Sequence, residues 1–171
     1  MVLTSVSNEA FIARLLFPVC VVAVVAPVHP LGRRSSVEVA DLADVPLLVL
    51  QRSFAARGWF DAECHNANVN PPILLESGAP ATLMALAASG DGAAIVPSHG
   101  SIPRNGVKAI PVTCRGKPIG RWIQAVWDRR RFFPSFAHHF VDELVAHVLR
   151  NYPGRDVLKR APPLRRPKLR E

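Results

Sequence analysis

Polar side chains follow two predicted strands of this chain, at the points where a helix is expected to begin. The first group is Gln51, Arg52, Ser53 and Phe54, and the second is Glu76, Ser77 and Gly78. The first turn of a helix presents backbone N–H groups and the positive end of the helix dipole, which together favour a carboxylate. We therefore predict that these residues bind a small ligand, most simply an organic anion.

Three further residues extend this candidate site. Arg57, on the helix that follows, either pairs with an anionic ligand or lies in solvent. Pro97 and Ser98 end a strand over 93–96 at the same predicted edge. Two structural alternatives stay open: Ser53 is placed to cap its helix, and the Glu76–Gly78 segment is also a plausible helix-initiating turn.

Catalytic and metal-binding chemistry has little basis in the sequence. His138 and His139 are adjacent on a predicted helix, so they point about 100° apart and cannot act as an i, i+4 metal pair. Cys20, Cys64 and Cys114 are widely spaced without a Cys-x-x-Cys pair, which argues against zinc and for reduced thiols in a cytoplasmic protein. A P-loop, a Gly-x-Ser-x-Gly elbow and a complete dinucleotide-binding glycine set are all missing. We expect no enzyme activity, no cofactor and no metal.

The stretch 82–98, TLMALAASGDGAAIVPS, indicates how the candidate residues are positioned. An apolar helix runs into Gly-Asp-Gly, where Gly90 can take the left-handed conformation that closes a helix, and a short apolar strand then ends at Pro97. Such a turn delivers a helix end and a strand to the edge of an α/β sheet. Ligands of open α/β sheets bind at the carboxyl ends of strands.

Hydrophobic periodicity predicts alternating strands and helices along the rest of the chain. The predicted strands cover 18–26, 46–50, 73–76, 93–96, 107–112 and 120–128, and the predicted helices cover 39–42, 55–67, 79–89 and 134–149. This alternation is typical of an α/β fold with a mixed or parallel sheet.

The order of these segments resembles the effector-binding domain of LysR-type transcriptional regulators, over residues 14–149. The marks are a strand followed by Pro27 and His29-Pro30-Leu31, the segment Val39-Ala40-Asp41-Leu42 with a proline at 46, and the turn over 90–97. The resemblance implies a periplasmic-binding-protein-like (type 2) fold, in which two lobes are joined by crossing strands and a small effector binds between them.

The resemblance also implies a domain organisation. Residues 1–13 would be a leader, 18–26 a crossover strand, 28–112 a complete second lobe, 113–149 the returning part of the first lobe, and 150–171 a tail. Family members begin with a winged helix-turn-helix, for which a chain starting at Met1 leaves no room. We expect a truncated regulator, an effector-sensing module that modulates transcription in the full-length protein and has no DNA-binding domain of its own.

The net charge of +8 is concentrated in the tail. Residues 150–171 contain eight Lys or Arg against Asp156 and Glu171, so the body is close to neutral. Four prolines and weak apolar periodicity predict that this tail is disordered or loosely attached. It would attract DNA only weakly through its Lys and Arg side chains, and a solubilising extension is the plainer alternative.

The apolar run Leu15–Val28 raises the questions of membrane insertion and export. It has only 14 residues and contains Pro18 and Pro27, so it is too short to span a bilayer. Arg14 before it and the small residues at 23–26 are compatible with a signal peptide, and the alternative function is an exported solute-binding protein of the periplasmic-binding fold. Its valines favour a buried strand instead, so we expect a cytoplasmic protein without membrane contact.

The last predicted helix, 134–149, carries apolar residues that a truncated first lobe would leave uncovered. They are Phe136, Phe140, Leu144, Val145 and Val148. Together with Val126 on the preceding strand, this surface predicts self-association or association with a full-length relative.

Overall fold

The computed structural model describes residues 10–152 and 154–167, and they form two compact units. Unit 1 contains residues 10–19, 121–152 and 164–167, and unit 2 contains 20–120 and 154–163. The boundary therefore falls inside two strands, β1 (Phe11–Val25) and β8 (Gly120–Asp128). Unit 2 includes the whole of the predicted second lobe.

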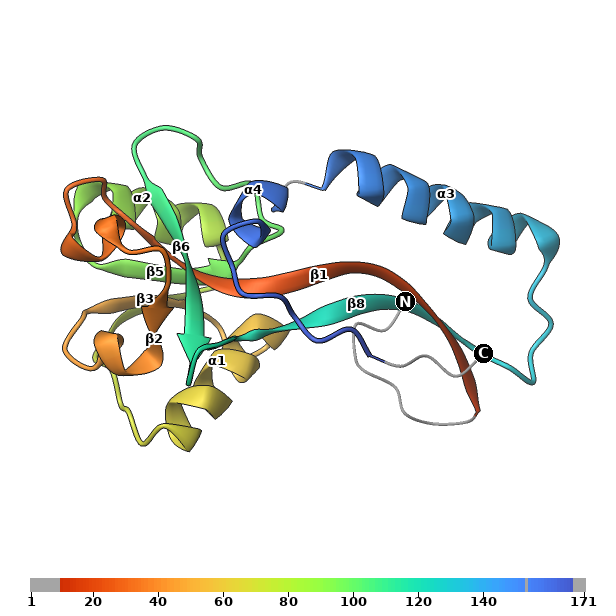
Figure 1. Ribbon diagram of the computed structural model, residues 1–171, viewed down its shortest axis with the longest axis horizontal. Helices are drawn as coiled ribbons and strands as arrows, with labels where there is room; N and C mark the ends of the chain where they lie inside the picture. The colour runs from red at the N-terminus through yellow and green to blue at the C-terminus, as the bar shows by residue number, and fades with distance from the viewer. Residues whose placement is uncertain (1–9, 153, 168–171) are drawn as a thin grey trace. The chain divides into compact units, whose positions relative to one another are not determined.

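The strands of unit 2 belong to a mixed sheet in the order β2-β6-β1-β5-β3-β4 (Figure 1). Its members are β2 (Val37–Glu38), β3 (Leu47–Leu50), β4 (Ile73–Ser77), β5 (Ala93–Pro97), β6 (Lys108–Cys114) and the end of β1, while the short β7 (Lys117–Pro118) pairs with β6. β3 is parallel to both β4 and β5, whereas β1 is antiparallel to β5 and β6. The predicted α/β class is confirmed.

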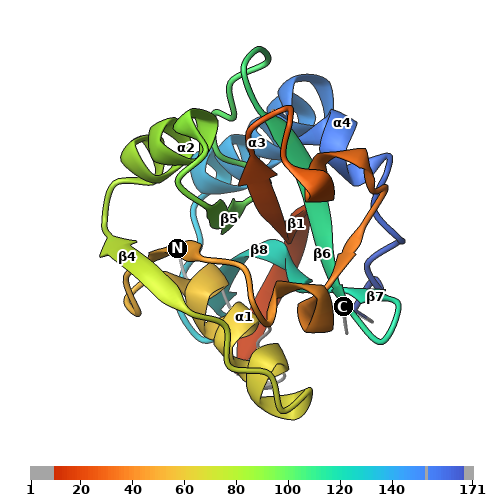
Figure 2. The same ribbon diagram turned by 90° about the vertical axis from the view of Figure 1, so that its left-hand side faces the viewer.

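Helices α1 (Ala55–Asn66) and α2 (Pro80–Ser89) cover opposite faces of this sheet (Figure 2). The chain moves outward from β3 to β4 through α1 and then back past β3 to β5 through α2. Because crossover connections between parallel strands are right-handed, reversing the direction of travel places the second helix on the other face. The segments around 30 and 39 are single turns of 3₁₀ helix, η1 (Pro30–Arg33) and η2 (Val39–Leu42).

The valine-rich run of β1 lies in the core of unit 2. From the sequence alone it could be interpreted either as a buried strand or as a signal peptide. Val21, Ala23 and Val25 of β1 lie in one buried cluster with Phe60 of α1 and Ile95 of β5. Val22 and Val24, which alternate with them, are also fully buried. A strand buried on both faces needs a continuous apolar sequence, and the predicted buried strand is confirmed. It begins at Phe11, earlier than predicted.

Unit 1 consists of the first part of β1, most of β8, and helix α3 (Ser135–Asn151). The buried apolar side chains of this unit are few: Leu15, Leu16, Val19, Ile123, Ala125 and Val141. Trp127 stacks on Phe133 with ring centroids 4.5 Å apart. Phe136 and Phe140, one turn apart on α3, are 74% and 66% exposed.

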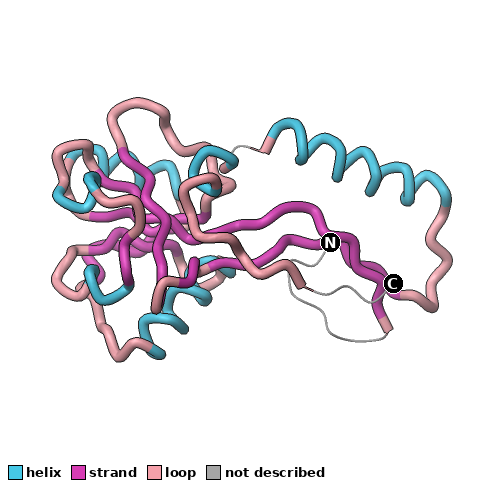
Figure 3. The backbone as a smooth tube through the Cα atoms, viewed as in Figure 1, coloured by secondary structure: helices cyan, strands magenta, loops and turns pink. Residues whose placement is uncertain are grey.

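The prediction that residues 150–171 are disordered or loosely attached is wrong for the part that the structure describes. Residue 151 still belongs to α3, and a one-turn helix, α4 (Arg155–Leu158), follows (Figure 3). Val157 of α4 is buried, because the turn packs against β6. A single buried valine leaves no periodic signal in the sequence, so composition alone predicted a disordered or loosely attached tail.

No helix among the described residues has the length and apolarity needed to cross a membrane.

Candidate functional site

The predicted site residues that follow β3 and β4 meet at the carboxyl edge of these two strands. Leu50 is in register with Ser77 across β3 and β4, and the Gln51 N–H donates to the Ser77 carbonyl at 3.2 Å. A Cβ atom added to Gly78 would lie 2.9 Å from Gln51 Oε1, so the Gln51 side chain lies directly over Gly78. Two loops that are separated in the sequence are therefore in contact, as their positions after parallel strands predicted.

Both helices that begin at this edge start without a side-chain cap. The N-cap of α1 is Phe54, whose side chain cannot accept a hydrogen bond, and the N-cap of α2 is Ala79. The capping alternative for Ser53 is therefore wrong, because the helix begins one residue later than a serine cap requires. Ser77 Oγ accepts from the Ala79 N–H at 3.1 Å, which orders the turn before α2. Arg52 and Ser53 are exposed beside the first turn of α1.

Arg57 is not solvent-exposed, and it forms hydrogen bonds within the protein. Its side chain is buried, and Nη1 donates to the Leu50 carbonyl at 2.7 Å and to Glu76 Oε2 at 2.9 Å. Nε donates to Asp61 Oδ1 at 2.7 Å. Burial by itself lowers the pKa of Arg57, but the hydrogen bonds to Asp61 and Glu76 outweigh burial and leave the pKa raised. The guanidinium is charged and already paired with two carboxylates.

Ser98 also forms hydrogen bonds within the protein. It is fully buried, its Oγ accepts from the Cys20 N–H at 3.2 Å, and its N–H donates to the Cys20 carbonyl at 2.8 Å. These bonds join the end of β5 to β1, beyond the register pair of Val21 with Pro97. Of the ten predicted residues, four have side-chain partners within the protein: Arg57, Glu76, Ser77 and Ser98. Gln51, Arg52, Ser53 and Gly78 are exposed, and Glu76 is exposed as well as paired. An effector-binding role for this exposed group stays a prediction.

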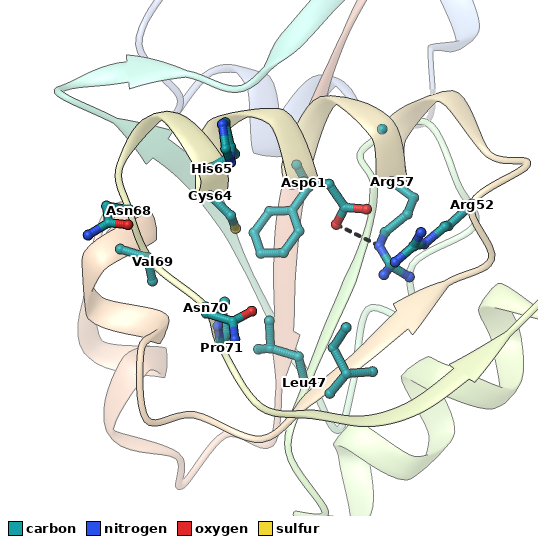
Figure 4. A pocket seen from close by; sticks show the side chains of 13 residues that line it. Leu47, Arg52, Arg57, Asp61, Cys64, His65, Asn68, Val69, Asn70 and Pro71 are labelled. Carbon is teal, nitrogen blue, oxygen red and sulfur yellow. Dashed lines mark hydrogen bonds and ion pairs between the residues drawn. The ribbon is translucent and has the colours of Figure 1, made fainter.

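A pocket of about 650 Å³ lies beside α1 in unit 2 and was not predicted from the sequence (Figure 4). It extends from Arg52 and Arg57 to the loop at 68–71. Apolar side chains contribute much of its lining: Leu47, Phe60, Val69, Pro71 and Ile73. Its walls come from a helix, the start of a strand and a loop, so no local motif marks it.

The thiols of this chain are not poised for reaction. Cys64 lines the pocket but is buried, and burial, followed by the negative charge of Asp61, raises its pKa to about 12. Because the thiolate is the nucleophile, such a group is inert at neutral pH. Cys20 and Cys114 are also buried, and burial raises the pKa of each. The described residues contain no cluster of three or more His, Cys, Asp or Glu side chains that could hold a metal ion.

Residues 1–149 match the family described as the LysR substrate binding domain. A curated relative, the uncharacterized HTH-type transcriptional regulator YybE of Bacillus subtilis (strain 168), is 26% identical over 119 residues, which are 70% of this chain and 40% of the relative. The chain thus spans less than half the length of this regulator.

Solved effector-binding and regulatory domains share the fold at low sequence identity. The effector-binding domain of QuiR in complex with shikimate is 21% identical with a TM-score of 0.67, covering 87% of this chain and 71% of that one. The regulatory domain of MetR from N. meningitidis is 19% identical with a TM-score of 0.72, covering 90% and 71%. The regulatory domain of Synechocystis PCC6803 CcmR in complex with 2-PG is 18% identical with a TM-score of 0.71, covering 85% and 70%.

Proposed function

The chain belongs to the LysR substrate binding domain family, and from this membership we propose that it is the effector-sensing module of a cytoplasmic transcriptional regulator. The module binds a small organic anion and thereby modulates transcription, while DNA is bound by another domain of the regulator. This role needs neither catalysis nor a cofactor. The exported solute-binding alternative shares the fold, but the family match and the relative YybE both favour a regulator.

The proposal that the effector is an anion rests on one observation. The N-terminus of α1 has no side-chain cap and lies beside the exposed Arg52 and Ser53. An uncapped helix start attracts negative charge, and an exposed guanidinium adds charge-assisted hydrogen bonds. Gly78 leaves room for the Gln51 amide at the same edge. The complex of the relative QuiR with shikimate, which carries a carboxylate, supports the same class of ligand.

We expect small carboxylates to stabilise the chain against heat, and Arg52→Glu to weaken their binding by about tenfold or more. The reason is that the substitution replaces an attractive charge by a repulsive one beside the helix start. The test is a thermal-shift screen with shikimate and other aromatic and aliphatic carboxylates, followed by calorimetric titration of those that bind. Arg104→Glu, at an exposed arginine elsewhere in unit 2, is the matched control and should leave binding unchanged.

Two results would contradict the anion proposal. Binding of neutral or cationic metabolites, without binding of any carboxylate, would show that the ligand class is wrong. An equal loss of binding in Arg52→Glu and Arg104→Glu would show only a general effect of net charge.

We also propose that the chain associates with itself through α3. Phe136 and Phe140 form an exposed apolar stripe, and the apolar surface that association covers contributes roughly 25 cal/mol per Å². Sedimentation at micromolar concentration should show dimers or larger species, and the double substitution Phe136→Ser with Phe140→Ser should shift them toward monomer. Val28→Ser, at an 88% exposed valine in unit 2, should not. A cooperatively unfolding monomer of the unsubstituted chain would disprove this proposal.

A further inference from the structure

The pocket beside α1 has a rigid apolar floor and a half-exposed apolar rim (Figure 4). Its floor includes Leu47 of β3 and Phe60 of α1, which belong to the buried core cluster of unit 2, so the packing of the core holds them in place. Ile73, the first residue of β4 and the register partner of Leu47, lines the pocket and is 52% exposed. A large aliphatic side chain that stays half in water beside a pocket of about 650 Å³ favours an apolar occupant.

Gly58 keeps one wall of this pocket open. It lies in the interior of α1, where glycine destabilises a helix relative to alanine. A Cβ atom added at Gly58 would meet nothing within 4 Å, and its φ is not positive, so neither packing nor backbone conformation requires a glycine there. Gly58 lines the pocket one helical turn before Asp61. The missing side chain therefore leaves space free in the pocket although it weakens the helix.

The charges that line the pocket are balanced except at one end. Arg57 donates to Asp61 at 2.7 Å, so these two side chains compensate one another. Arg52 lies near Arg57 and is exposed (Figure 4), and its side chain has no ion-pair or hydrogen-bond partner among the residues that the structure describes. The opposite end, at the loop over 68–71, carries amide and apolar side chains. A ligand that lies along α1 therefore meets an unpaired arginine at one end only.

We propose that the pocket beside α1 binds a carboxylate with an extended apolar chain, whose carboxylate pairs with Arg52 and whose chain lies on Leu47 and Ile73. This inference rests on the proposed anion site at the start of α1, and it adds the class of the ligand and the place of its apolar part. All the residues that line the pocket belong to unit 2.

A series of straight-chain carboxylates tests the inference on the full chain without any substitution. Butyrate, hexanoate, octanoate and decanoate carry the same charged group and differ only in the length of the apolar chain. Each methylene group that leaves water for the pocket strengthens binding. We expect the dissociation constants, measured by calorimetric titration below the concentrations at which these compounds form micelles, to fall about fivefold for every two methylene groups added.

Ile73→Asn and Leu74→Asn are a matched pair of variants. Leu74 follows Ile73 on β4, is 59% exposed and points to the other face of the sheet. Ile73→Asn should weaken octanoate binding about fivefold and butyrate binding by less than about twofold, whereas Leu74→Asn should change neither. Gly58→Leu, which places an aliphatic side chain beside the pocket at an unstrained helical position, should weaken octanoate binding about tenfold.

The results distinguish this inference from the proposed function. If all four carboxylates bind with the same affinity and Arg52→Glu weakens the binding of each, the anion site stands and the pocket inference is overturned. If no carboxylate binds at any chain length, the anion proposal and the pocket inference both fail. An equal loss of octanoate binding in Ile73→Asn and Leu74→Asn would also overturn the inference, because the chain would then not lie on the face of the sheet that α1 covers.

Discussion

Gly92→Ala is expected to destabilise the chain by about 3 kcal/mol or more. A Cβ atom at this position would lie 2.4 Å from the Pro46 carbonyl oxygen, and the backbone φ of Gly92 is +150°. The clash is with backbone rather than with the end of a flexible side chain. It cannot be relieved without moving Pro46, the residue directly before β3, whose carbonyl accepts the Ala93 N–H at 3.0 Å.

Gly90→Ala is the matched control, two residues away in the same turn. Gly90 has φ +98° and closes α2 in the left-handed conformation, but a Cβ there meets nothing within 4 Å. Only backbone strain remains, so a loss of about 1 kcal/mol is expected. Urea unfolding of both variants measures the difference. Equal losses would show that the contact with Pro46 is not the determinant.

Arg57→Met is expected to cost about 2–3 kcal/mol of unfolding free energy. The methionine fills much of the space but leaves the buried Leu50 carbonyl without its donor, and it leaves Asp61 and Glu76 without their shared cation. The two carboxylates are 41% and 42% exposed, so water screens part of the penalty and the cost stays below that of a fully buried pair.

Arg52→Met provides the comparison for Arg57→Met. Arg52 is exposed, and its replacement should change the unfolding free energy by no more than about 0.5 kcal/mol. The measurement is again the midpoint of urea unfolding, with an unchanged slope as evidence that the native state keeps its compactness. A loss for Arg57→Met as small as that for Arg52→Met would mean that the three hydrogen bonds contribute little net stability.

The carboxyl edge illustrates what local patterns predict well. Parallel strands that are each followed by a helix end at the same edge of the sheet. Gln51 after β3 therefore lies next to Gly78 after β4, although the two residues are far apart in the sequence. The strands and helices of the α/β pattern were predictable for the same reason, because periods of two and 3.6 residues are local properties.

The partners of individual side chains were not predictable in this way. Arg57 pairs with Glu76, 19 residues away, and Ser98 bonds to Cys20, 78 residues away. Each contact depends on which strands are neighbours. An arginine on an amphipathic helix and a serine after a strand are compatible with solvent, with a ligand or with burial until that order is known.

The sequence by itself determined the α/β class, the turn at Gly90 to Gly92, the buried strand β1 and the family, because each is expressed in consecutive residues. Only the tertiary structure decided that Arg57 and Ser98 form hydrogen bonds within the protein. It also decided that a pocket lies beside α1 and that the tail packs against unit 2 through Val157. The physical reason is common to all of these: burial and ion pairing depend on atoms that the fold brings together, and their energies do not appear in the spacing of residues along the chain.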